Sequence, residues 1–191
     1  MPLALITPPD SEPLLLGEVK NDLRIDDDDN DSFLEGLIVV ARDFVESETN
    51  RALVLQTWEL SLDSFAAEIM LPKPSLISVV SVSYVDTAGA VQALDPSVYQ
   101  VDSRSVPGRL RPAYGEQWPA TREEMNAVTI RFTCGYGSRL QVPRGIKKAM
   151  ILLIGHYFKN REETTDRKQY TLPNGIQALI GPYIIPRTME Y

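Results

Sequence analysis

The strongest constraint on the fold is a change of hydrophobic period that occurs twice along the 191-residue chain. Apolar residues recur at helical spacing up to about residue 51, alternate with polar residues from about residue 53, and return to helical spacing after Pro143. Helical and alternating patterns bury different kinds of face, so these segments cannot form one kind of layer. The sequence therefore predicts an α+β fold in which a small antiparallel β module interrupts a helical layer.

Two helices are expected in residues 14–51. The run Asp26–Asp31 separates them, and Ser32 with Glu35 forms a capping-box pattern at the start of the second helix. Polar residues of this second helix, Glu46 among them, are expected on its solvent face. Its apolar stripe consists of Phe33, Leu34, Leu37, Ile38, Ala41, Phe44 and Val45.

The β module is expected over residues 53–134. Alternation is complete in residues 57–63, which places Trp58 in the predicted core. Asp86-Thr87-Ala88-Gly89 is typical of a hairpin turn. The last predicted strand alternates around Val128, Ile130 and Phe132.

A long helix is expected over residues 143–160, opened by Pro143. It is apolar on most sides and must therefore be buried on most sides, either by the flanking helices or by another subunit. Assembly through this helix predicts a subunit interface made of Ile146, Met150, Leu153, Ile154, Tyr157 and Phe158.

Two terminal segments are expected to behave as arms. Residues 1–13 are punctuated by prolines and predict an extended arm. In residues 161–191 a polar linker precedes an apolar segment, which predicts an arm that docks on a partner surface. The alternative, a helix folded back on the core of its own subunit, stays open. The docking residues on the first interpretation are Ile176, Leu179, Ile180 and Tyr183.

Charge is divided unevenly along the chain. Residues 1–50 carry thirteen acids and three bases, whereas residues 143–191 carry four acids and eight bases. Opposite charge at the two ends could steer copies into head-to-tail association, or it could mark two solvated faces with no partner. The net charge of −7 does not fit a protein that wraps nucleic acid.

The sequence contains few residues that indicate catalysis. A single cysteine, Cys134, and a single histidine, His156, exclude an ordinary Cys/His zinc site within one chain. The Asp26–Asp31 run fits no calcium-loop template, because the glycine and glutamate that the template requires are absent. We predict no catalytic residue, no metal and no cofactor. The longest apolar run is too short for a membrane helix, and no secretory pattern stands at the N-terminus, so neither a membrane location nor secretion is expected.

Several segments occur in the order found in a known family. They are residues 14–25, the Asp-rich break, residues 31–42, Glu48–Leu53, Gln56-Thr57-Trp58, Asp95–Tyr99, Pro107–Leu110, and Thr133–Gly137 followed by Val142–Lys147. This ordered set resembles the head–tail connector (adaptor) proteins of tailed bacteriophages and prophages, over roughly residues 14–160.

The resemblance implies a structural protein without enzymatic activity or cofactor. It implies a ring of identical subunits, expected to be dodecameric, at the head–tail junction of the virion after synthesis in the cytoplasm of a bacterial host. The ring would sit under the portal, and the resemblance implies that the portal is the partner on which the predicted C-terminal arm docks. The ring would contact the next connector, stopper or tail protein, and leave a channel in which genomic DNA passes without specific binding. Two alternatives stay open: a tail-completion or other phage assembly module, and a metal-dependent enzyme using the Asp26–Asp31 run.

Overall fold

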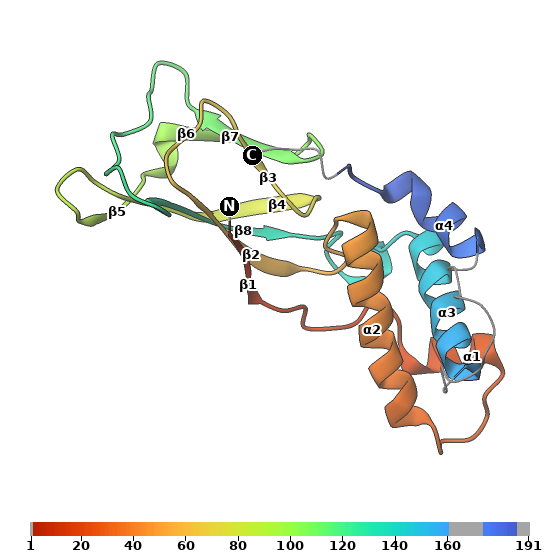
Figure 1. The fold of residues 1–191 in the computed structure, drawn as a ribbon. Coiled ribbons are helices and arrows are strands. Elements are labelled where there is room, and N and C mark those ends of the chain that lie inside the picture. The colour runs from red at the N-terminus through yellow and green to blue at the C-terminus, as the bar shows by residue number, and fades with distance from the viewer. Residues whose placement is uncertain (1, 161–173, 187–191) are drawn as a thin grey trace, which may run out of the picture. The chain divides into compact units, whose positions relative to one another are not determined.

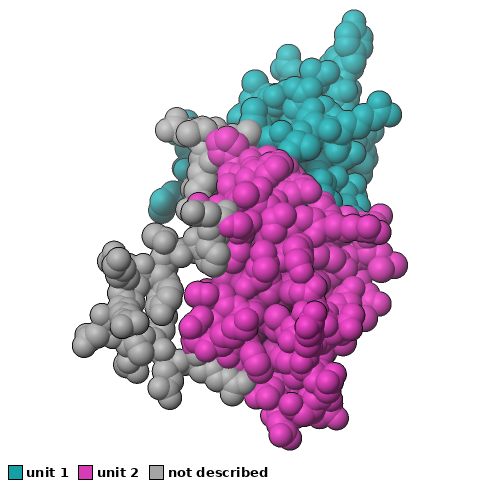
Figure 2. All heavy atoms as spheres, turned by 90° about the vertical axis from the view of Figure 1, so that its right-hand side faces the viewer, with its two compact units in different colours: residues 1–10, 55–137, 188–191 teal, residues 11–54, 138–187 magenta. Residues whose placement is uncertain are grey.

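The computed structural model of the chain describes residues 2–160 and 174–186. It contains two compact units, coloured separately in Figure 2. Of the described residues, 2–10 and 55–137 belong to unit 1, and 11–54, 138–160 and 174–186 belong to unit 2. Unit 1 is built of strands and unit 2 of helices, so the predicted α+β fold with a β module between helical segments is confirmed.

Unit 1 consists of two antiparallel sheets (Figure 1). The larger has the strand order β1-β2-β8-β4-β5 and the smaller the order β3-β7-β6. The strands are β1 (Leu3–Thr7), β2 (Gln56–Leu62), β3 (Ile69–Leu71), β4 (Leu76–Val85), β5 (Val91–Ala93), β6 (Tyr99–Asp102), β7 (Gly108–Pro112) and β8 (Val128–Cys134). Close approach of β7 to β4 requires a glycine, because a Cβ at Gly108 would overlap the side chain of Leu76.

The core of unit 1 follows from the alternation predicted for β2 and β8. These strands pair so that Leu60 faces Ile130, and all but about 1% of each side chain is buried. The next residue pair, Glu59 and Arg131, points to the opposite face, where the two side chains form an ion pair of 2.7 Å. Period-two alternation therefore separates a buried apolar face from a charged outer face.

The N-terminal segment takes part in the larger sheet. Residues 1–13 are predicted to be extended, and Leu3–Thr7 within them forms β1, which pairs antiparallel with β2. Leu3 lies opposite Leu60, and Leu5 lies opposite Trp58. The prolines indicated the extended backbone, but nothing in this segment indicated its partner strand.

Trp58 is not a fully buried core residue, contrary to the sequence-based expectation. Its ring is half-buried, and the Lys73 ammonium lies 5.3 Å from the ring centroid. The indole Nε1–H donates a hydrogen bond of 3.0 Å to Gln56 Oε1. The alternation places Trp58 on the same face of β2 as the buried Leu60 and Leu62, as expected, but its ring keeps part of its surface exposed.

Unit 2 is built around one central helix. Its helices are α1 (Leu16–Leu23), α2 (Asp31–Thr49), α3 (Arg144–Lys159) and α4 (Asn174–Ile180), followed by a 3₁₀ turn (Gly181–Tyr183). Helices α1, α2 and α4 all pack against α3. The close contact with α1 depends on Gly155, because a Cβ there would lie 2.9 Å from Leu23 Cδ2. None of the described helices is long and apolar enough to cross a membrane.

The start of α2 differs from the predicted capping box. The helix begins at Asp31, and its N-cap is Asn30, whose side chain makes no capping hydrogen bond. The carbonyl of Asn30 accepts the Leu34 N–H at 2.9 Å, which is the first bond of the helix. Ser32 therefore lies one residue inside the helix, where its hydroxyl cannot cap the free N–H groups.

The end of α2 is fixed by a buried carboxylate. Glu46 is buried, not on the solvent face, and its Oε1 accepts the Leu53 N–H at 2.7 Å. The guanidinium of Arg42 lies 3.6 Å from its other oxygen. A buried carboxylate needs such partners, because burying an unpaired charge is costly. The hydrogen bond from the Leu53 N–H fixes the position of the chain segment that follows α2.

We expect Phe132→Ala to cost about 3–5 kcal/mol of unfolding free energy, because Phe132 is completely buried in unit 1. Trp58→Ala should cost less, about 1–3 kcal/mol, because its ring is only half-buried; the substitution also removes the cation–π contact with Lys73. Denaturant unfolding of both variants measures the two values. An equal or larger loss for Trp58→Ala would contradict the strand packing described above.

Candidate assembly surfaces

The six residues predicted as a subunit interface on α3 fall into two groups. Ile146, Met150, Leu153 and Ile154 are almost completely buried, because α1, α2 and α4 cover the helix within the same chain. Their burial does not agree with a role in a subunit interface, and it matches the alternative of cover by the flanking helices. Helical periodicity identifies a face that must be covered but not the chain that covers it.

The other two interface residues, Tyr157 and Phe158, are half-buried at the end of α3. The Phe158 ring packs on Phe33 of α2 with a centroid distance of 6.3 Å. Next to them, the Asn160 side chain donates a hydrogen bond of 2.8 Å to the His156 carbonyl. Part of this aromatic cluster remains accessible, so a contact between subunits through Tyr157 and Phe158 stays a prediction.

The predicted docking arm is folded back on unit 2. Ile176 and Ile180 of α4 are buried, and α4 packs against α3. The backbone after α4 is also held, because the Arg51 Nε–H donates to the Tyr183 carbonyl at 2.6 Å and the Ile185 N–H donates to the Thr49 carbonyl at 3.0 Å. This is the alternative that the sequence left open.

The prediction that four residues of this segment dock on the portal is therefore corrected for two of them. Ile176 and Ile180 face the core, while Leu179 and Tyr183 are half-buried and keep some accessible surface. The polar linker predicted before α4 falls mainly in residues 161–173, which lie outside the described residues. Spacing alone could not distinguish an arm from a short packed helix, since both need the same apolar stripe.

The Asp26–Asp31 run is organised by one lysine. Lys20 Nζ lies 2.6 Å from Asp28 Oδ1 and 2.7 Å from Asp31 Oδ1. The hydrogen bond from Lys20 holds the pKa of Asp28 below its ordinary value. Among the described residues, no group of three or more His, Cys, Asp or Glu side chains could hold a metal ion. The arrangement is that of a surface salt-bridge cluster between α1 and the start of α2.

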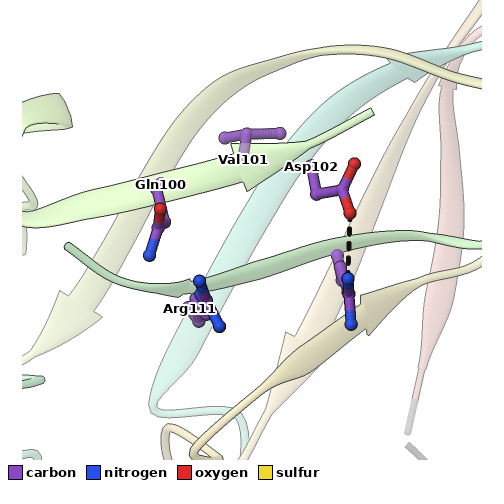
Figure 3. A pocket seen from close by; sticks show the side chains of 5 residues that line it. Gln100, Val101, Asp102 and Arg111 are labelled. Atoms are coloured by element: carbon purple, nitrogen blue, oxygen red, sulfur yellow. Dashed lines mark hydrogen bonds and ion pairs between the residues drawn. The ribbon is translucent and has the colours of Figure 1, made fainter. Parts of the chain in front are cut away.

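One shallow pocket lies on the smaller sheet of unit 1 (Figure 3). Asp102 occupies one side and accepts hydrogen bonds from the Ser105 hydroxyl at 2.7 Å and from Arg109 Nε at 3.0 Å. These donors hold the pKa of Asp102 well below its usual range. The carboxylate is thus committed to the β6–β7 connection and is not a poised general base. The pocket is lined by Gln100, Val101, Asp102, Arg109 and Arg111.

Two solvent-facing helix surfaces in unit 2 carry features that the sequence-based interpretation did not use. On α2, Phe33 and Val40 are 41% and 48% exposed, so Phe33 lies outside the core to which the predicted stripe assigned it. On α3, Leu152 is 40% exposed. Val40 lies off the predicted stripe of α2, and an apolar residue on a predicted polar face is the signal that could have found this surface.

One family model matches part of this chain. Residues 14–87 match the family model described as "Phage gp6-like head-tail connector protein". The predicted resemblance to head–tail connectors is confirmed. The matched segment contains α1, α2 and β2 to β4, so it takes in the first two helices and the beginning of the β module. A comparison with curated proteins found no match.

Solved structures show the same fold over the whole chain. A chain in the neck of an empty gene transfer agent (GTA) particle, computed with C6 symmetry, has a TM-score of 0.81 at 24% identity. A chain of a native gene transfer agent virion has a TM-score of 0.80 at 23% identity, and one in the neck of a native particle, computed with C12 symmetry, has 0.75 at 23% identity. Each match covers 100% of this chain and 99% of the other chain. At these identities the matches establish the shared fold.

We expect Ile176→Ala to cost about 2–5 kcal/mol of unfolding free energy, because it leaves a cavity between α4 and α3. The exposed neighbour Gln177 supplies the matched control, and Gln177→Ala should change stability by less than about 0.5 kcal/mol. Thermal and denaturant unfolding measure both. If Ile176→Ala leaves stability unchanged, α4 does not belong to the core.

Replacing Asp27 and Asp28 together by Asn should change thermal stability little, because the Lys20–Asp28 ion pair is on the surface. Calcium or magnesium should raise the melting temperature of neither the wild type nor the variant. Differential scanning fluorimetry with and without each cation measures this. A cation-dependent stabilisation that disappears in the variant would establish a metal site in the aspartate run.

Proposed function

We propose that this protein is the subunit of a connector ring at the head–tail junction of a phage-like particle. The observation that carries the proposal is the match of residues 14–87 to a head–tail connector family. The shared fold with chains of gene transfer agent neck structures, over the full length of this chain, supports it. The ring is expected to be dodecameric, in keeping with the C12 symmetry of one of those necks.

The polar and reactive groups of both units fit a structural role. The buried groups of both units are used for packing: the Cys134 side chain is buried at the end of β8, and the Glu46 carboxylate holds the chain after α2. Asp102, whose pKa is held well below its usual range, accepts hydrogen bonds from Ser105 and Arg109. We infer that the protein acts without catalysis, through the contacts that its exposed surfaces make.

We propose three kinds of partner for the ring. Identical copies form the ring itself, a portal protein binds one end, and the next connector, stopper or tail protein binds the other. Genomic DNA passes through the channel without specific binding. The net charge of −7 supports this last point, because an acidic protein repels the phosphate backbone and does not retain it.

Native mass spectrometry and electron microscopy test the proposal. The purified chain, alone and mixed with the portal protein encoded beside it, should yield a closed ring, and isolated particles should contain that ring in the neck. A preformed portal raises the local concentration of subunits, so rings that form only on the portal also agree with the proposal. A chain that stays monomeric alone, stays monomeric with portals and is missing from isolated particles contradicts it.

A further inference from the structure

One apolar face of α2 remains partly exposed in unit 2. Phe33, Gly36 and Val40 lie on this face at spacings of three and four residues, and we call them the α2 outer face. Phe33 and Val40 are exposed, and an added Cβ at Gly36 would meet nothing within 4 Å. The helix therefore presents an apolar strip that is shallow at Gly36, between the side chains of Phe33 and Val40.

The exposed side of α3 has the opposite character. Arg144, Lys148, Leu152 and Lys159 follow one another at helical spacing, and we call them the α3 outer face. All four are exposed, and Leu152 is apolar in the middle of a basic row. Lys148 pairs with Asp22 at 2.9 Å, whereas Arg144 and Lys159 form no ion pair with any described residue.

The surroundings of the α2 outer face are acidic. Asp43 lies about one turn beyond Val40, and its side chain is 65% exposed although it contacts Arg42 at 2.8 Å. Asp29 is exposed just before the start of the helix. The α2 outer face is thus an apolar strip with acids at both ends, and the α3 outer face is an apolar residue with bases at both ends. The two faces are complementary in charge.

We propose that the α2 outer face of one copy packs against the α3 outer face of the next copy in the ring. This inference rests on the proposed connector ring and names the surfaces that build it. The two faces differ, so the contact is head-to-tail, and repeated head-to-tail contacts close into a ring when the rotation between copies allows it. An apolar centre with a charged rim is the usual composition of such an interface.

The direction of the helices supports this pairing. Within unit 2, α2 and α3 run antiparallel, because Phe33 at the start of α2 packs on Phe158 at the end of α3. In a ring of twelve, neighbouring copies differ by a rotation of about 30°, which tilts any helix by no more than about that angle. The α2 helix of one copy and the α3 helix of the next therefore stay close to antiparallel.

The antiparallel direction also aligns the charges. Lys159 at the end of one copy's α3 would lie near Asp29 at the start of the other's α2. Arg144 at the start of α3 would lie near Asp43. Asp43 lies about 18 Å along α2 from its first residue, which Asp29 precedes, and the two bases are separated by roughly 20 Å along α3, at about 1.5 Å per helical residue. Both ends of the contact can thus be neutralised in one register, with Leu152 against the apolar strip.

Two single variants test the contact. Val40→Asp and Leu152→Asp each place a carboxylate in the proposed apolar centre, and both positions are exposed, so each variant should fold with near-normal stability. Val91→Asp on β5 is the matched control, because Val91 is 75% exposed and lies in unit 1. Analytical ultracentrifugation and native mass spectrometry, under the condition in which the wild type forms rings, measure assembly.

Each of the two variants alone should fail to form rings, with self-association weakened at least about tenfold, while Val91→Asp assembles normally. An equimolar mixture should form a one-to-one heterodimer and nothing larger. Val40→Asp keeps its α3 outer face and Leu152→Asp keeps its α2 outer face, so one intact contact remains per pair. The other two faces of the pair both carry a substitution. Two carboxylates would meet there, so this second contact does not form.

A crosslinking pair gives a second readout. Gly36→Cys and Leu152→Cys, mixed and oxidised, should yield a disulfide-linked dimer of the two different variants, because the two positions face each other in the proposed register. Cys134 is buried and does not compete. Either cysteine variant alone should yield little dimer.

The failures of the two proposals are distinguishable. Normal rings from both aspartate variants, or large rings from their mixture, overturn the contact proposed here and leave the connector ring standing. Loss of portal binding with rings intact also overturns it, because the two faces would then bind the portal and not a second copy. A wild-type chain without rings in solution, on portals or in isolated particles contradicts the connector ring and this contact with it.

Discussion

The structure of unit 2 depends on the enclosure of α3. This helix is apolar on nearly all sides, and burying its side chains is the largest source of stabilisation available to a unit of this size. Helices α1 and α2 come from the N-terminal part of the chain and α4 from its C-terminal part, and all three pack against α3. The close contact at Gly155 and the burial of Ile176 are two results of the same requirement. Any surface used for assembly must therefore lie outside this core.

Much of the architecture could be predicted because the hydrophobic period is a local property. The switch to alternation and back placed the β module between the helices, and the residues that face inward on β8 were those expected, Val128, Ile130 and Phe132. Which element or chain covers an apolar face depends on the tertiary structure and could not be predicted in the same way. The stripe on α3 is the same whether its own chain or a second subunit buries it, so Ile146 and Met150 were assigned to the wrong environment.

Single-residue assignments failed where a tertiary partner overrode the local pattern. Glu46 belongs to the polar face by periodicity, yet the Leu53 N–H draws it into the interior. Ser32 has the sequence context of a cap, yet Lys20 binds Asp31 and Asp28 and the N-cap lies two residues earlier, at Asn30. In both cases a contact with a residue seven to eleven positions away decided the outcome, and helical periodicity does not describe such contacts.

The uneven distribution of charge takes on a structural meaning in unit 2. The acidic first quarter of the chain supplies α1 and α2, and the basic last quarter supplies α3, so folding brings segments of opposite charge together in one unit. Some of this charge is neutralised internally, as between Lys148 and Asp22. The remainder lies on the outward sides of α2 and α3. A unit that is acidic on one side and basic on another attracts its own copies in one orientation and repels them in others. That asymmetry favours directional, closed assembly over random association, and the exposed apolar residues on the same faces add attraction at short range.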